Sequence, residues 1–112
     1  MITAEHAKEL LKLGEKLNLN FRNLLSDLST NERIIAETLF EYGMFDDISD
    51  TIVYSALINR KNEIEYGKAH FDLYVTEYEI APLNEIVTLT INILKKAGFQ
   101  VKDFTMELLI RW

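Results

Sequence analysis

Residues 95–112, KKAGFQVKDFTMELLIRW, decide the fold of this chain. In the later part of this stretch every second side chain is apolar: Phe104, Met106, Leu108, Ile110 and Trp112. A period of two is typical of a strand that packs one face on a core. Phe99 and Val101 are in the opposite phase, so the change near Lys102 and Asp103 predicts a bulge or a tight turn.

Trp112, the only tryptophan, closes this pattern. Burial of five such side chains would contribute roughly 8 to 15 kcal/mol before the entropy of ordering is subtracted, which is comparable to the net stability of a whole domain. We therefore expect Trp112 to anchor the core. A position at an interface is the alternative, because a large ring near a chain end needs something to hold it.

The N-terminal half is predicted to be helical. From Ala4 to Leu17, apolar residues fall on one arc of a helical wheel and charged residues on the other, and Thr3 can cap the first turn. Asn18 and Asn20 suit a break, after which residues 21–28 are expected to form a short second helix.

A third helix is expected at residues 30–42. Ser29 and Glu32 have the spacing of a capping box, and Gly43 suits the left-handed conformation that ends a helix. Phe40 lies almost opposite the apolar face of this helix. Either the helix is therefore contacted on two sides, or Phe40 is exposed.

The second half mixes strands with a helix. Residues 46–60 fit a helix and a strand about equally well, and we favour a mostly buried helix. Residues 69–80 alternate as a strand does and are rich in aromatic and β-branched side chains. Residues 83–96 keep their polar side chains in one arc of a helical wheel and end in two lysines before Gly98, which predicts a helix.

Together these elements predict an α+β fold. It has a helical N-terminal half, followed by strand, helix and strand, with a small sheet that the C-terminal strand closes. Residues 1–112 have the length of one ordinary domain, and with one proline and four glycines there is no linker to divide them. We therefore expect a single domain.

Composition excludes several classes of function. The chain has no cysteine, which rules out disulfides and thiol chemistry. Its net charge of -6, from 12 basic and 18 acidic residues, would repel the phosphates of nucleic acid. No stretch has the pattern of a secretory signal or a membrane span, so we expect a cytoplasmic protein with neither nucleic acid nor membrane as a direct partner.

Catalytic, metal and cofactor sites are not expected. His70 and Asp72 would share a face of the predicted strand and could serve a metal or a general base, but a zinc site needs further ligands. The three aspartates in residues 46–50 lack the glycine and the closing glutamate of a calcium loop. The sequence therefore predicts a protein that is not an enzyme.

Aromatic residues are the best candidates for a functional surface, because tyrosine offers a large apolar area with a polar tip and is enriched at interfaces. His70, Tyr74 and Tyr78 are predicted on the non-core face of the strand at 69–80, where they would form a recognition patch unless helices cover that face. Phe40 and Trp112 complete the candidate protein interface.

Three short motifs have counterparts in other proteins. They are the helix start Ile2, Thr3, Ala4, the turn Leu94, Lys95, Gly98, Phe99, Val101, and the closing Ile110 and Trp112. In these motifs the chain resembles a loose class of small, mostly uncharacterised bacteriophage proteins. The resemblance covers the first helix and residues 69–112, while residues 44–66 look like an insertion. It implies a phage origin and action through protein contacts, and it carries over no functional residue.

We therefore expect a non-enzymatic interaction protein of the phage type. It would act in the virion or in the host cytoplasm, and bind a host protein or associate with itself as a homo-oligomer. A small sheet has two edges, and an uncovered edge is free to pair. The alternative is an acidic inhibitor that sequesters a host enzyme or a nucleic-acid-binding protein.

Overall fold

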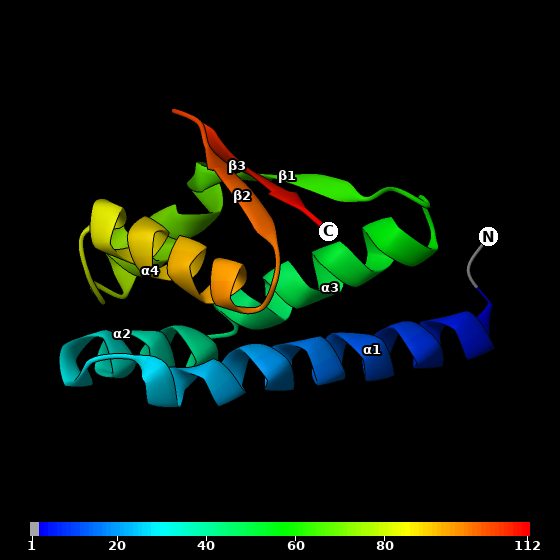
Figure 1. The fold of residues 1–112 in the computed structure, drawn as a ribbon, viewed down its shortest axis with the longest axis horizontal. Coiled ribbons are helices and arrows are strands. Elements are labelled where there is room, and N and C mark those ends of the chain that lie inside the picture. Colours follow the sequence, from blue (N-terminus) through cyan, green and yellow to red (C-terminus); the bar gives the residue numbers. More distant parts are fainter. Residues whose placement is uncertain (1–2) are drawn as a thin grey trace.

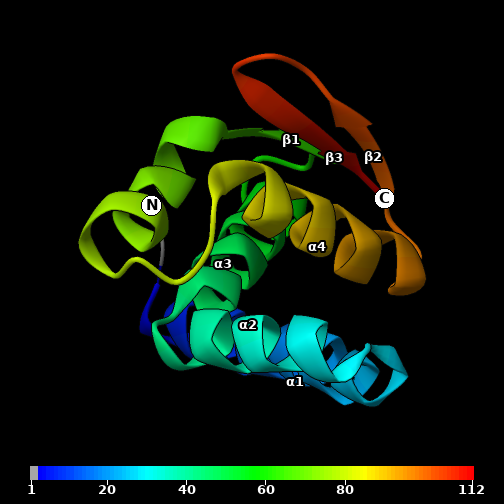
Figure 2. The same ribbon diagram turned by 90° about the vertical axis from the view of Figure 1, so that its left-hand side faces the viewer.

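The predicted α+β fold is confirmed by the computed structural model, which describes residues 3–112. In chain order the elements are α1 (Ala4–Asn23), η1 (Leu24–Asp27), α2 (Thr30–Glu41), α3 (Met44–Leu57), β1 (Glu63–Gly67), η2 (Lys68–Phe71), η3 (Leu73–Glu77), α4 (Leu83–Lys96), β2 (Gln100–Asp103) and β3 (Glu107–Arg111). Figures 1 and 2 show α1 and α2 in one layer, α3 and α4 in the next, and the sheet above them.

Helix α1 is longer than predicted, and the expected break at Asn18 and Asn20 is wrong. Asn18 Nδ2 donates a hydrogen bond to Asp46 Oδ1 at 2.7 Å, and Phe21, about one turn further on, is fully buried. These contacts outweigh the low helix propensity of asparagine. The short second helix is reduced to η1, a single 3-10 turn.

Helix α2 matches its prediction to within a residue. The N–H of Glu32 donates to Ser29 Oγ at 3.3 Å, which is the first bond of a capping box, and Ser29 Oγ donates to Glu32 Oε1 at 2.8 Å. Gly43 follows with φ +84°, the left-handed conformation that glycine adopts without strain.

Residues 46–60 are mostly helical, as favoured from the sequence, and belong to α3. This helix contacts α1, α2 and β1, which surround it on several sides. Ile48 and Val53 are therefore both buried although they point in different directions. Helix α4 confirms the prediction for residues 83–96, and Gly98 after it has φ +98°.

Strand β3 is the middle strand of the sheet, whose order is β1-β3-β2, and it pairs antiparallel with both neighbours. Leu108 and Ile110 on its inner face are fully buried. The predicted change of phase is a tight turn between β2 and β3, where the N–H of Phe104 donates to the carbonyl oxygen of Glu107 at 2.9 Å.

Two side chains that were predicted to face the core lie at this turn instead. Met106 is 77% exposed and Phe104 is also exposed, because the turn extends beyond the layer of helices that the sheet covers. Trp112, at the other end of β3, is 39% exposed. The prediction that Trp112 anchors the core is therefore wrong: Leu108 and Ile110 are buried, whereas Trp112 lies at the margin of the core.

The strand predicted at residues 69–80 is wrong. The segment forms the 3-10 helix η2 and the single π-helical turn η3. Its buried residues Phe71 and Tyr74 are three positions apart, which is a helical spacing, and Thr76 Oγ1 donates to the carbonyl oxygen of Asp72 at 2.7 Å.

The strand of this region is β1, which comes earlier. Ile64 and Tyr66 are buried on its inner face, whereas Glu63 and Glu65 are not buried. Its register with β3 places Ile64 opposite Ile110. A strand of five residues is thus held by its pairing with β3 and by its inner side chains.

Candidate interaction surfaces

The structure divides the predicted patch of His70, Tyr74 and Tyr78. His70 is exposed on η2 and stacks on Tyr66, with ring centres 4.6 Å apart. Tyr74 is buried, whereas Tyr78 is exposed and stacks on Tyr42, with ring centres 4.4 Å apart. Because residues 69–80 are not a strand, the three predicted side chains do not share one outer face.

Phe40 and Trp112 have different surroundings. Phe40 is buried between the ring of Phe45, 4.2 Å away between ring centres, and the guanidinium of Arg22, 5.4 Å from the ring centre. Helix α2 is thus contacted on two sides, and Phe40 is covered within the chain itself. Trp112 lies edge-on to Phe99, with ring centres 6.4 Å apart, and keeps part of its ring in solvent.

Trp112 and Phe99 form one side of an apolar groove of about 320 Å³, which we call the Trp112 groove. Its other walls are Leu13 and Leu17 of α1 and Ile52, Val53, Ala56 and Leu57 of α3. Leu13 is 41% exposed and Leu57 is 47% exposed. Large apolar side chains that surround one hollow and remain in solvent are typical of a protein interface.

A second hollow of about 230 Å³ adjoins this groove at Leu57, which lines both. It is formed by His6, Glu9 and Leu10 of α1 with Leu57, Ile58 and Arg60. The residues that α1 contributes to the two hollows follow one another at spacings of three or four and so lie on one side of the helix. The Trp112 groove therefore continues along the seam between α1 and α3.

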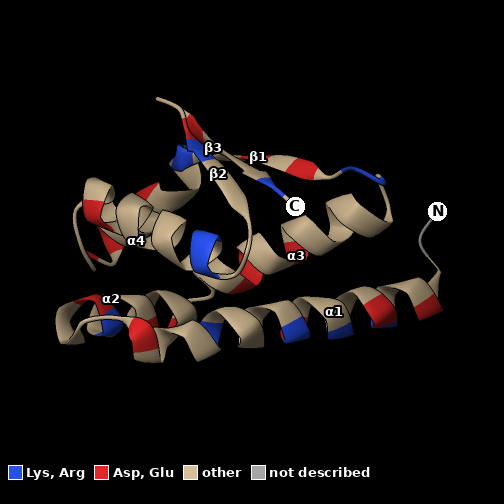
Figure 3. Ribbon diagram, in the orientation of Figure 1, with Lys and Arg blue, Asp and Glu red and all other residues tan. Residues whose placement is uncertain are grey.

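The groove has a charged rim on α1. Glu9 lies at the hollow near the N-terminal end, and Lys16 lies at the groove itself. Figure 3 shows acidic residues near the N-terminal end of α1 and basic residues in its middle. On α1, the hollow thus has an acid, Glu9, and the groove has a base, Lys16, while Arg60 lines the same hollow as Glu9.

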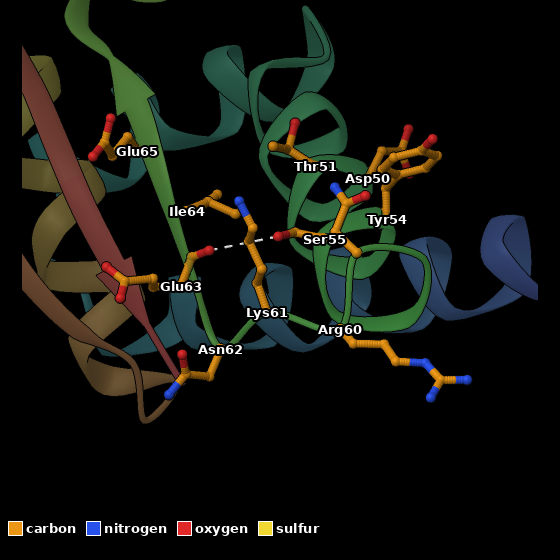
Figure 4. Close-up of a pocket in the computed structure, with 11 residues that line it drawn as sticks. Asp50, Thr51, Tyr54, Ser55, Arg60, Lys61, Asn62, Glu63, Ile64 and Glu65 are labelled. Atoms are coloured by element: carbon orange, nitrogen blue, oxygen red, sulfur yellow. Dashed lines mark hydrogen bonds between the residues drawn. The ribbon is translucent and has the colours of Figure 1, made fainter.

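A larger and more polar cleft, of about 1040 Å³, lies between α3 and β1. Figure 4 shows Asp50, Thr51 and Tyr54 on α3 and Glu63, Ile64 and Glu65 on β1 across the cleft, with the side chains of Glu63 and Glu65 pointing away from α3. The side chain of Lys61 extends into the space between them. Ser55 Oγ donates to the carbonyl oxygen of Glu63 at 3.5 Å across the cleft.

Tyr66 and Asp47 join the sheet to α3. The hydroxyl of Tyr66 donates to Asp47 Oδ2 at 2.5 Å. Burial, the hydrogen bond to Asp47 and the charge of that carboxylate raise the pKa of Tyr66 above its usual value, and burial followed by the charge of Asp47 raises the pKa of Tyr74. The hydroxyls of Tyr66 and Tyr74 therefore stay protonated at neutral pH, and the hydrogen bond between Tyr66 and Asp47 is a structural link.

Sequence reasoning missed the groove and the cleft. Leu13 lies outside the main apolar arc of α1, and an apolar residue beside the polar arc was the available signal. Residues 63–67, EIEYG, alternate as a strand does, but over too short a run to be distinguished from a loop.

Within residues 3–112, no group of three or more His, Cys, Asp or Glu side chains is placed to hold a metal ion. No helix in the described part of the chain is long and apolar enough to cross a membrane. Comparison with known protein families, with curated proteins and with solved structures found no match for the chain. Of the motif that opens the first helix, Ile2 lies outside the described residues, while Thr3 caps α1 and Ala4 begins it.

Proposed function

We propose that this protein acts through protein–protein contacts, without catalysis, and that a second copy of the chain binds the Trp112 groove. The single observation that carries the proposal is the groove itself, around which Leu13, Leu57 and Trp112 all remain partly in solvent. Covering these side chains would remove apolar surface from water, which is the main favourable term in association.

The charges on α1 support a second copy as the occupant. An antiparallel pairing of two α1 helices, centred between Lys12 and Leu13, places Glu9 beside Lys16 of the second copy. Twofold symmetry forms this contact twice, because Glu9 of each copy then lies beside Lys16 of the other copy. Exposed ion pairs contribute only about 0.2 to 1 kcal/mol each, so apolar burial supplies the affinity and the charges set the orientation.

A matched pair of substitutions tests the groove. Leu13→Arg puts a charge into it, whereas Leu11→Arg puts the same charge on the opposite side of α1, at a leucine that is even more exposed. Sedimentation equilibrium should show a concentration-dependent dimer for the wild type and for Leu11→Arg. Leu13→Arg should weaken the dimer by at least about tenfold, since a buried unpaired charge costs more than the 1.4 kcal/mol that this factor represents.

A charge reversal tests the antiparallel arrangement. Glu9→Lys should weaken dimerisation, because it places lysines opposite each other, and Glu9→Lys combined with Lys16→Glu should restore it. A wild type that stays monomeric at every concentration would contradict the proposal, and so would an equal effect of Leu11→Arg and Leu13→Arg.

The resemblance to small bacteriophage proteins extends the proposal to a biological setting. On that basis the protein is a phage-encoded interaction factor, either part of the virion or directed at the host in its cytoplasm. Self-association through the groove fits a component that assembles, and it leaves the cleft beside β1 free for a different partner.

A further inference from the structure

Strand β1 is an edge strand with one side unpaired. It pairs with β3, and no further strand follows it in the sheet order β1-β3-β2. The N–H of Trp112 donates to the carbonyl oxygen of Asn62 at 3.0 Å, and the N–H of Lys68 donates to the carbonyl oxygen of Met106 at 2.8 Å. Even-numbered residues at both ends of β1 thus point their backbone groups toward β3.

Because backbone groups alternate in direction along a strand, the N–H and C=O groups of Glu63, Glu65 and Gly67 point away from β3. The carbonyl oxygen of Glu63 accepts a long hydrogen bond of 3.5 Å from Ser55 Oγ on that side, and within residues 3–112 no hydrogen bond engages the backbone groups of Glu65 there. Glu65 therefore offers both a donor and an acceptor to a further strand.

There is space beside this edge. The cleft of about 1040 Å³ lies between β1 and the side of α3 that carries Thr51 and Tyr54 (Figure 4). Lys61 extends into the cleft, and neither ion pair found among the described residues involves it. This long side chain can swing out without breaking an ion pair.

We propose that β1 accepts an extended segment of a partner protein in which basic and apolar side chains alternate. Opposite charges on neighbouring strands stabilise a sheet, so a basic side chain of the segment would lie beside Glu65. A second would lie near Glu63, whose Oε1 already has Arg111 Nη2 of β3 at 3.4 Å. Its other side chains would lie beside Ile64 and face Thr51 and Tyr54 across the cleft. Main-chain hydrogen bonds supply affinity in this mode of binding, and alternate side chains supply specificity.

A second copy of the chain is a poor occupant of this edge. The antiparallel registers with the greatest overlap place Glu65 opposite Glu65, or Glu63 opposite Glu65, and like charges in such positions destabilise a sheet. Acidic residues on an edge also discourage unspecific pairing. The same acids admit a basic strand, so the charge of β1 selects among partners.

The test uses a capped peptide that alternates lysine with valine and is long enough to span β1. It is titrated into the Leu13→Arg variant, so that failure of the proposed dimer does not affect the result. We expect saturable binding, with the backbone amide signals of Glu63, Glu65 and Gly67 among those that shift most. A scrambled peptide with its lysines contiguous should bind at least several-fold more weakly.

Methylation of peptide nitrogens tests the strand pairing directly. Methylating every second amide on one side of the peptide should abolish binding, and methylating the alternate set should preserve it, because only one set faces β1. Glu63→Gln with Glu65→Gln should weaken binding several-fold, whereas Glu37→Gln with Glu41→Gln, which removes two acids from α2, should leave it unchanged.

Three results would overturn the inference. The first is that the alternating peptide does not bind. The second is that the two sets of methylated peptides bind equally well or equally poorly, and the third is that the two pairs of glutamine substitutions change peptide binding equally. The inference would also be overturned if the Leu13→Arg variant still formed a dimer and the added substitution Glu65→Lys abolished that dimer. The edge of β1 would then pair with a second copy of the chain.

Discussion

The backbone N–H of Trp112 donates a hydrogen bond to the carbonyl oxygen of Asn62 at 3.0 Å. This contact extends the pairing of β3 with β1 to the last residue of the sequence and holds the indole beside Phe99 and the seam of α1 and α3. It also fixes which backbone groups of β1 face outward. The pairing of β1 with β3, of which this hydrogen bond is the last, thus orients both proposed interaction surfaces.

Tyr66→Phe should destabilise the fold by about 1.5 to 3 kcal/mol, because it removes a partly buried hydrogen bond to a charged group. Chemical denaturation measures this loss. Tyr78→Phe is the matched control, since Tyr78 is exposed and its hydroxyl donates no hydrogen bond within the described residues. Equal losses in the two variants would show that the bond between Tyr66 and Asp47 contributes nothing.

Asp50→Asn should stabilise the protein at neutral pH and not at acid pH. Burial of its carboxylate, together with the charges of Asp46, Asp47 and Glu15, raises the pKa of Asp50 above its ordinary value of 3.8. The folded state therefore holds this proton more tightly than the unfolded state, and stability is lost as pH rises through the raised pKa. The effect is modest, because Asp50 is partly exposed and solvent screens it.

Melting temperatures of the wild type and Asp50→Asn, compared from below pH 3.8 to neutral, measure this linkage. Their difference should be small in acid and grow with pH. Glu37→Gln removes one acid from an exposed position on α2 and controls for net charge. A difference that is the same at every pH would contradict the stated cause.

Glu79→Gly should stabilise the fold by about 0.5 to 1 kcal/mol, since Glu79 has φ +48°, a conformation that strains every residue except glycine. The N–H of Ile80 donates to the carbonyl oxygen of Tyr74 at 2.9 Å and holds the chain in this turn. Glu77→Gly, inside η3, should instead destabilise the fold by about 1 kcal/mol. Chemical denaturation that ranked these variants in the reverse order would contradict this explanation.

The fold class was predictable because the helices of this chain carry strong local signals. The capping box at Ser29 and Glu32, Gly43 at the end of α2, and the polar arc of α4 each specify an element without reference to the rest of the molecule. These signals act within a few residues, which is the range that sequence patterns describe best.

The remaining elements depend on contacts between distant residues. Asn18 is helical because it donates to Asp46, and β1 is a strand because Ile64 pairs opposite Ile110. At residues 69–80 the alternation of aromatic residues imitated a strand, while the buried pair Phe71 and Tyr74 follows a helical spacing. Local patterns alone do not decide such cases.

One residue of the predicted interface, Trp112, lines the groove. Trp112 was singled out for its size and its place in the alternation, and it does lie at the groove. Leu13 belongs to α1 and Leu57 to the end of α3, so only the packing of α1 on α3 brings them to the same hollow.

The emission spectrum of Trp112, recorded across a dilution series of the purified protein, tests the central claim most directly, because this is the only indole in the chain. If a second copy covers the groove, emission is blue in concentrated solution and shifts to the red on dilution, and Leu13→Arg shows the red spectrum throughout. Emission that is independent of concentration in the wild type, and identical in Leu13→Arg, would contradict self-association through the Trp112 groove.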